Sequence, residues 1–194
     1  INQYTLTYTA LAGGSISGAA TQTVDYGSDG TEVTAIPDTG YHFVNWTNGS
    51  TNPSRTDTNV TADITQTASF AINQYTLTYT AASGGTISGA TPQTVNYGSN
   101  GTAVTAMPST GYHFEQWSDG IMTATRTDTG VTGNISVSAS FTVNQYTVTY
   151  DGNGSTGGSA PPGNPYTYDY NNTVTVQNNS GSFVKTGYTF TGWN

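Results

Sequence analysis

Two histidines are the side chains of this sequence best suited to acid-base or metal chemistry, and each stands alone. His42 and His113 both lie between a tyrosine and a phenylalanine. Because side chains alternate along a strand, each histidine should face away from its phenylalanine, toward solvent or a loop. Zinc sites use three or four protein ligands, which one histidine cannot supply. We therefore expect both histidines to be structural, and we predict no metal site.

A repeated Arg-Thr-Asp-Thr motif is the second candidate for chemistry. Arg55 precedes Asp57 by two residues, and Arg126 precedes Asp128 in the same way. On a strand, this spacing places both side chains on one face. The arginine could contact a sugar or a carboxylate ligand, or its planar guanidinium could anchor a loop. Because the chain has only three Lys and Arg residues, reuse of one at the same place favours an internal ion pair.

Aspartates in the first part of the chain could in principle bind calcium, namely Asp25, Asp29, Asp38, Asp57 and Asp63. The sequence contains no Asp-x-Asp-x-Asp loop that ends in glutamate, which is the usual calcium loop. At the positions 71 residues later, four of the five are replaced, by Asn96, Asn100, Ser109 and Asn134. A shared strong site would not lose four carboxylates, so we expect solvated charges rather than a calcium site.

No arrangement for covalent or general acid-base catalysis is present. Serine and threonine abound, but only the two histidines and Lys185 could activate them, and no nucleophile elbow or phosphate-binding loop occurs. Lys185 could form an isopeptide bond with an Asn or Asp, yet residues 1–142 contain no lysine. We therefore predict no catalytic residues, no cofactor and no enzymatic activity.

Charge and composition narrow the class of protein further. Three basic residues against eleven acidic ones give a net charge of −8, which argues against binding to nucleic acid. No apolar run approaches the roughly 18–20 residues of a membrane span, so we expect no membrane insertion. The absence of cysteine excludes disulfides and weakly favours a bacterial source. Many β-branched and aromatic residues, with glycine for turns, predict an all-β fold.

The segments that position these residues are internal repeats of the sequence. A shift of 71 residues aligns residues 1–71 with residues 72–142 without a gap, and 45 of the 71 pairs are identical. A more divergent third copy spans residues 143–194, and we call the three copies modules 1, 2 and 3. Modules 1 and 2 continue for 25 residues after Trp46 and Trp117, whereas module 3 continues for one after Trp193. Module 3 therefore lacks the last strand region.

Within each module the apolar residues recur at every second position, which is typical of half-buried strands. Ile135, Val137, Ala139 and Phe141 alternate with serines, for example. A module of this size needs its large aromatic side chains to form a core. The predicted core residues are Tyr4, Tyr8, Tyr41, Phe43, Trp46, Phe70, Tyr75, Tyr79, Tyr112, Phe114, Trp117, Phe141, Tyr146, Tyr188, Phe190 and Trp193.

The connections between modules are short. Only four residues, 71–74, separate Phe70 from Tyr75, and none of them is Gly, Ser or Pro. Four extended residues span about 13 Å, so neighbouring modules should sit close together with restricted rotation. Asn144 and Gln145 repeat Asn73 and Gln74 at the second connection, which predicts a similar geometry there.

Several ordered motifs resemble a known family. Gly-Tyr-x-Phe-x-x-Trp, with Tyr-Thr-Val-Thr-Tyr-Asp-Gly-Asn-Gly in module 3, is similar to the Listeria–Bacteroides repeat, also called the internalin B B-repeat. Modules 1 and 2 resemble its divergent form, and the likeness covers essentially the whole chain. It implies a β-grasp-like module, found in tandem in secreted or wall-attached bacterial proteins, that serves as a stalk or an adhesive repeat without catalysis.

Three hypotheses follow. The first is an extracellular, non-enzymatic stalk or spacer on a bacterial surface, with partners among modules of the same or neighbouring chains. The second is an adhesin module for a glycan or a cell-surface protein, for which Tyr166, Tyr168 and Tyr170 form the best exposed stripe, although Tyr168 is expected to replace core Tyr97. The third is a filament subunit. We expect the edge of Tyr146–Tyr150 to be covered, either by further residues of the array or by a strand of a neighbouring subunit.

Overall fold

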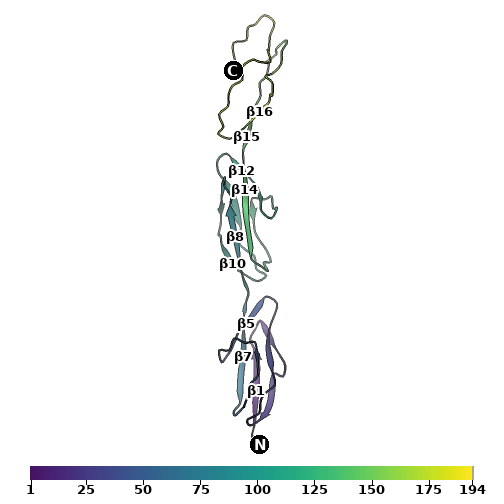
Figure 1. The fold of residues 1–194 in the computed structure, drawn as a ribbon, viewed down its shortest axis with the longest axis vertical. Coiled ribbons are helices and arrows are strands. Elements are labelled where there is room, and N and C mark those ends of the chain that lie inside the picture. The colour runs from purple at the N-terminus through teal and green to yellow at the C-terminus, as the bar shows by residue number, and fades with distance from the viewer. Residues whose placement is uncertain (194) are drawn as a thin grey trace. The chain divides into compact units, whose positions relative to one another are not determined.

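The computed structural model describes residues 1–193, and these residues form strands, turns and loops with no helix (Figure 1). The predicted all-β tandem array is confirmed. Among the described residues, no helix is long and apolar enough to cross a membrane.

The strands follow the repeat of the sequence. Module 1 contains β1 (Gln3–Ala10), β2 (Gly14–Ser17), β3 (Thr21–Asp25), β4 (Val33–Pro37), β5 (Tyr41–Trp46), β6 (Ser54–Arg55) and β7 (Ile64–Ile72). Module 2 contains β8 (Gln74–Ala81), β9 (Gly85–Ser88), β10 (Gln93–Asn96), β11 (Val104–Pro108), β12 (Tyr112–Trp117), β13 (Thr125–Arg126) and β14 (Ile135–Val143). Module 3 contains β15 (Gln145–Val148) and β16 (Tyr166–Asp169).

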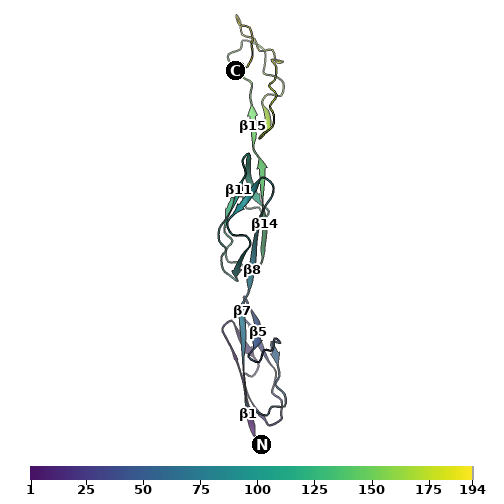
Figure 2. The ribbon, with the colours of Figure 1, turned by 90° about the vertical axis from the view of Figure 1, so that its left-hand side faces the viewer.

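Each complete module has one four-stranded sheet with its first and last strands at the centre. In module 1 the order is β3-β1-β7-β5, and β1 and β7 run parallel, with Leu6 beside Ile64 and Ala10 beside Ala68. The outer strands β3 and β5 pair antiparallel with them, and both views show β5 beside β7 (Figure 2). A second sheet has the order β2-β4-β6. Module 2 repeats both sheets as β10-β8-β14-β12 and β13-β11-β9.

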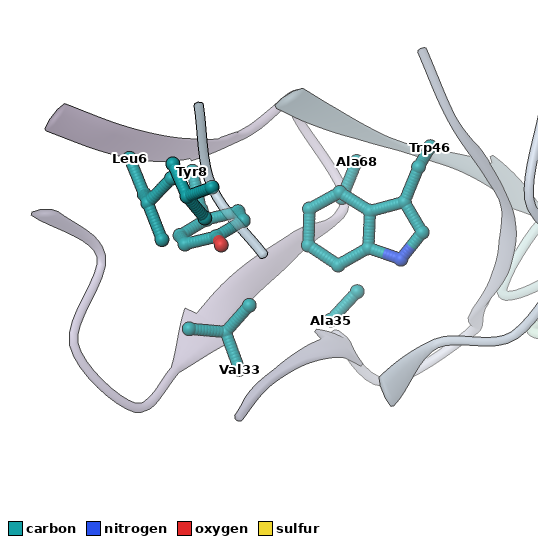
Figure 3. Close-up of a cluster of buried hydrophobic side chains, with 7 residues drawn as sticks. Leu6, Tyr8, Val33, Ala35, Trp46 and Ala68 are labelled. Carbon is teal, nitrogen blue, oxygen red and sulfur yellow. The ribbon is translucent and has the colours of Figure 1, made fainter. Parts of the chain in front are cut away.

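The core of module 1 lies between these two sheets and combines one large indole with small aliphatic side chains. Figure 3 shows Trp46 with Ala68 of β7 and Ala35 of β4 next to its ring, and Tyr8, Leu6 and Val33 further along. The alternation of β1 explains the geometry, because Leu6 and Tyr8 share the face that is covered while the threonines between them face outward. Val60 also belongs to this core, on a loop.

The predicted aromatic core splits into three groups. The fully buried members are Tyr8, Trp46, Tyr79 and Trp117. Half-buried members are Tyr4, Tyr41, Phe43, Phe70, Tyr75, Phe114, Phe141 and Trp193. Four predictions were wrong, because Tyr112, Tyr146, Tyr188 and Phe190 are exposed by 38%, 54%, 76% and 44%.

Three of these four errors have a physical cause. The ring of Tyr112 lies against Gly84 as that of half-buried Tyr41 lies against Gly13, so this contact does not explain the greater exposure of Tyr112. The other three belong to module 3, where the described residues include no counterpart of the central strand β7 or β14 that packs beside such aromatics in the complete modules. An aromatic residue is buried only where a neighbouring element covers it.

By their contacts, the residues divide into two compact units. One contains Ile1–Thr78, Ala90–Ala103 and Thr127–Ser136, and the other contains Tyr79–Gly89, Val104–Arg126 and the chain from Val137 onward. Module 2 therefore contributes residues to both units. The connection between modules 1 and 2 belongs to the first unit, and the connection between modules 2 and 3 belongs to the second.

Candidate functional site

The two histidines lie at the connections between modules. His42 is exposed, and its Nδ1 is hydrogen-bonded at 2.8 Å to Oδ1 of Asn73, the residue between β7 and β8. His113 makes the same bond at 2.8 Å to Asn144, the residue between β14 and β15. The predicted solvent-facing position is confirmed. Each histidine is hydrogen-bonded to the asparagine that connects two modules, which is a structural role.

Backbone hydrogen bonds fix the same asparagines from both sides. The N–H of Asn73 donates to the carbonyl of Gly40, and the carbonyl of Asn73 accepts from Tyr97, both at 2.8 Å. At the second connection, Asn144 donates to Gly111 at 2.8 Å and accepts from Tyr170 at 2.7 Å. One residue of each connection is therefore tied to the module before it and to the module after it.

A tyrosine of the following module closes each connection by lying on a glycine. Gly40 has a φ of +83°, and a Cβ built there would meet ring carbons of Tyr97. Gly111 has a φ of +82° and stands in the same relation to Tyr170. We call these two sets of contacts the junctions. Tyr170, rather than Tyr168, takes the place of Tyr97, so that prediction was wrong: the register of module 3 places Tyr168 opposite Tyr146.

The Arg-Thr-Asp motif of module 1 forms the predicted ion pair beneath the core. Arg55 Nε and Nη2 donate to the two carboxylate oxygens of Asp57 at 3.1 and 2.5 Å, and the Tyr8 hydroxyl donates to Asp57 at 2.7 Å. The guanidinium lies 5.1 Å from the centre of the Trp46 ring, within range of a cation–π interaction. Only 9% of the Arg55 side chain is exposed, so this group serves as an anchor rather than a ligand site.

Burial sets the electrostatics of this cluster. Burial and the hydrogen bond to Asp57 raise the pKa of Tyr8 far above its usual value. Burial alone would also raise the pKa of Asp57, but the hydrogen bonds from Arg55 and Tyr8 outweigh it and hold that pKa below its usual value. The carboxylate therefore stays ionised and the phenol neutral over the whole physiological range.

The arginine of module 2 pairs with an aspartate for which module 1 has no counterpart. Arg126 forms an ion pair at 2.9 Å with Asp119, a partner that the sequence analysis did not predict. This hydrogen-bonded pair lowers the pKa of Asp119. Module 1 has Asn48 at the matching position, and there the buried Nη1 of Arg55 has no hydrogen-bond partner among the described residues.

Three of the four replaced aspartates of the calcium hypothesis act as hydrogen-bond acceptors. One carboxylate oxygen of Asp63 accepts the backbone N–H of Thr5 at 2.8 Å, and Asn134 accepts that of Thr76 at 2.9 Å. Asp29 and Asn100 likewise accept a backbone N–H, at 2.8 and 2.9 Å. Asp25 and Asn96 each accept a glutamine amide, at 3.0 and 3.1 Å. An amide oxygen can do all three tasks as well as a carboxylate, which explains the replacements.

The structure offers no support for a metal site or for an isopeptide bond of Lys185 among the described residues. Within residues 1–193, no group of three or more His, Cys, Asp or Glu side chains is placed to hold a metal ion. The Nζ of Lys185 lies 3.4 Å from the backbone oxygen of Asn153 and 5.4 Å from the centre of the Tyr188 ring.

Sequence reasoning missed the buried glutamines. Gln22 donates to the carbonyls of Ala19 and Thr31 and accepts the N–H of Thr31 at 2.6 Å, and so closes the loop that follows β3. Gln93 repeats all three bonds in module 2. The available signal was that both copies keep glutamine at this position.

Module 3 contains a hollow beside its tryptophan. It measures about 640 Å³ and lies between the end of β15 and Trp193, with Tyr150, Val174 and Val176 in its wall. The Trp193 ring is 4.7 Å from that of Tyr150, whereas the corresponding distance is 6.1 Å between Tyr8 and Trp46 in module 1. The two rings are therefore closer together in module 3 than in module 1.

Comparisons with known proteins agree with the module order. A family model described as the divergent InlB B-repeat domain matches residues 4–74 and again residues 75–145. A second model, described as the Listeria-Bacteroides repeat domain, matches residues 146–194. A protein of Evansella cellulosilytica described as a "Putative membrane protein" is 30% identical over 201 residues. The alignment covers all of this chain, which spans 29% of the length of that relative. No solved structure matches the chain significantly.

Proposed function

Because this chain belongs to the family of InlB B-repeats, with a Listeria–Bacteroides repeat as its third module, we propose that it is a non-enzymatic repeat segment of a bacterial surface or secreted protein, in which it acts as a semi-rigid spacer. The description of the Evansella cellulosilytica relative as a membrane protein supports a place at the cell envelope.

The observation that carries this proposal is that both junctions are built from the same contacts. Each uses one asparagine held by two backbone hydrogen bonds, one histidine bonded to that asparagine, and one tyrosine ring on a glycine. A connection that only had to link two domains would need none of these contacts, and flexible linkers are rich in Gly and Ser. Contacts that recur at both connections favour a spacer in which each module restrains the next.

Distance measurements between spin labels can test the proposal. The chain contains no cysteine, so labels can be placed at will. Val44→Cys in β5 and Glu115→Cys in β12 are exposed, matching positions of modules 1 and 2, each at the bulge of its strand. Pulsed electron spin resonance should give a narrow distance distribution for this pair.

The matched control carries the same two labels and a Gly-Ser-Gly insertion after Asn73, which separates the junction contacts without touching either core. The distribution should broaden strongly in this variant. An equally broad distribution in the unmodified chain and in the insertion variant would mean that the junction does not restrain the modules, and the spacer proposal would fail.

A further inference from the structure

The turn that follows β5 in module 1 contains an Asn-Gly pair, and the matching turn of module 2 contains an Asp-Gly pair. Asn48 and Gly49 stand where module 2 has Asp119 and Gly120. The two backbones agree closely: each glycine N–H donates to the carbonyl of the buried tryptophan of its module at 2.8 Å, and the glycine φ angles are +86° and +85°. The side chain that precedes each glycine therefore starts from the same place.

The arginines beneath these two turns also occupy equivalent places. The guanidinium of Arg55 lies 5.1 Å from the centre of the Trp46 ring, and that of Arg126 lies 5.1 Å from the centre of the Trp117 ring. The distance from each guanidinium to the buried tyrosine ring of its module is 5.7 Å in both cases. What differs between the two turns is therefore the side chain that the arginine can reach.

In module 2 the arginine binds a carboxylate, whereas in module 1 one of its donors is left over. Nη1 and Nη2 of Arg126 lie 3.1 and 2.9 Å from the two carboxylate oxygens of Asp119. In module 1, Oδ1 of Asn48 accepts the N–H of Ser50 at 3.1 Å, and the buried Nη1 of Arg55 has no hydrogen-bond partner among the described residues. An unpaired buried donor is costly. Module 1 thus has the turn and the cation of an ion pair, with an amide in place of the acid.

We propose that Asn48 is a modification site, at which the side-chain amide is hydrolysed to a carboxylate through attack by the backbone nitrogen of Gly49, and that the resulting aspartate pairs with Arg55. Asparagine followed by glycine is especially prone to this reaction, because glycine has no side chain to hinder the attack. Both residues are exposed, and a Cβ built at Gly49 would meet none of the described atoms within 4 Å, so the turn can open locally. The proposal does not rest on the spacer function, because this turn lies outside both junctions.

The reaction needs water and no other reagent. The Gly49 nitrogen loses its proton to hydroxide and forms a bond to Cγ of Asn48; the bond from Cγ to Nδ2 breaks, ammonia leaves, and a cyclic succinimide results. Water then attacks Cγ and breaks its bond to the Gly49 nitrogen, which regains a proton and leaves aspartate in a normal backbone. Attack at the other ring carbonyl gives isoaspartate instead, in which the main chain runs through Cγ. Overall, asparagine and water become aspartate and ammonia, with no oxidation or reduction.

Two hydrogen-bond donors favour the route to aspartate. Both attacks at Cγ place negative charge on Oδ1 of Asn48. The N–H of Ser50 already donates to this oxygen, and Nη1 of Arg55 stands where its counterpart in module 2 donates to a carboxylate. Donors aimed at an oxygen that gains negative charge lower the barrier of such an attack. Isoaspartate would also lengthen the backbone of the turn by one atom and disturb its hydrogen bond, whereas aspartate keeps the turn and gains the ion pair.

The chain contains two further Asn-Gly pairs that serve as internal controls. In module 2, Asn100 accepts the N–H of Gly130 at 2.9 Å, and a Cβ built at Gly101 would lie 2.7 Å from Leu77, so packing restrains this pair. In module 3, Asn153–Gly154 is exposed, but that module contains no arginine. The first control tests the effect of packing on the rate, and the second tests the effect of the arginine on the product.

Ageing of the intact 194-residue chain in mildly alkaline buffer, followed by peptide mapping with mass spectrometry, tests the proposal. Electron-transfer fragmentation separates aspartate from isoaspartate. Asn48 should convert at least about tenfold faster than Asn100, whose loop must first unpack. Its product should be mainly aspartate, whereas Asn153 and a synthetic peptide of residues 45–53 should give mainly isoaspartate. Equal rates at Asn48 and Asn100, or mainly isoaspartate at Asn48, would overturn the proposal.

Two variants test the role of the arginine. Asp119→Asn builds an Asn-Gly turn over Arg126 and should return to aspartate with the rate and the product ratio of Asn48. Asn48→Gln is the control that should not react, because glutamine cyclises far more slowly. After ageing, the denaturant midpoint of module 1 should approach that of Asn48→Asp in the unmodified chain and stay constant in Asn48→Gln. An Asp119→Asn chain that keeps its amide, or an aged chain with aspartate but an unchanged midpoint, would contradict capture by the arginine.

Discussion

Modules 1 and 3 contain the same aromatic elements but bury them differently. Trp46 is fully buried between the two sheets of module 1, whereas Trp193 is only half-buried in module 3. The two modules share a first strand, a tyrosine stacked near the tryptophan and a Gly-Tyr-x-Phe-x-x-Trp segment. Among the described residues, module 3 has no strand that matches the central strand of module 1. The comparison indicates that the central strand, rather than the aromatic residues alone, makes the core of this fold.

The largest expected effect is the loss of an indole from a complete module. Trp117→Ala removes a fully buried side chain and should lower the unfolding free energy of module 2 by about 3–5 kcal/mol, enough to unfold a small domain. Trp193→Ala is the matched change in module 3 and should have a much smaller effect, since its ring is half-buried. Urea unfolding of both variants checks this. Equal losses would contradict the idea that burial of the indole decides how much each tryptophan stabilises its module.

Next in size is the effect of crowding a junction. Gly40→Ala places a methyl group against the Tyr97 ring at a positive φ and should cost about 2–4 kcal/mol, from backbone strain and overpacking together. Gly49→Ala is the control, because Gly49 has a φ of +86° with nothing within 4 Å. It should show the strain alone, about 1–2 kcal/mol. Thermal melts that do not distinguish the two variants would argue against a tight junction.

Removal of the hydroxyl of Tyr8 should have a smaller effect that depends on pH. At neutral pH, Tyr8→Phe should cost about 1.5–3 kcal/mol, because Asp57 loses a donor while it stays ionised. Tyr26→Phe, at an exposed position, should change little. Hydrogen exchange of the module 1 amides can measure both.

The pH dependence follows from the two shifted groups. The raised pKa of Tyr8 stabilises module 1 fully below about pH 10, and this contribution falls as pH rises through the folded pKa. The lowered pKa of Asp57 stabilises the module above about pH 4, and this contribution is lost as pH falls through the folded pKa. Tyr8→Phe should therefore abolish the alkaline loss and shift the acid loss to higher pH. An unchanged alkaline profile would contradict the buried hydrogen bond.

The smallest expected effect is a gain. Asn48→Asp gives Arg55 Nη1 the partner that Asp119 provides for Arg126, and it should stabilise module 1 by up to about 1 kcal/mol, since the carboxylate is partly exposed. Asp119→Asn should remove a similar amount from module 2. Denaturant midpoints of the two variants should move in opposite directions, and a shift in the same direction would refute the equivalence of the two sites.

The repeat, the strand alternation and the short connections could all be read from the sequence, because each leaves a local pattern. The place of Tyr170 at the second junction could also have been read, because Thr167-Tyr168-Asp169-Tyr170 has the same pattern as Thr94-Val95-Asn96-Tyr97. The ion pair of Arg126 with Asp119 could not, because it joins side chains from two separate segments and no local spacing predicts it. The core positions of Val33, Ala35 and Val60 were missed because small aliphatic residues give a weaker signal than aromatic ones.

Amide hydrogen exchange at three equivalent threonines tests most directly whether the central strand makes the module. Thr5 and Thr76 donate their N–H groups to Asp63 and Asn134 on the side of the central strand, at 2.8 and 2.9 Å. Thr147 stands at the same place in module 3. The account predicts slow exchange at Thr5 and Thr76 and fast exchange at Thr147. Exchange at Thr147 that is as slow as at Thr76 would contradict it.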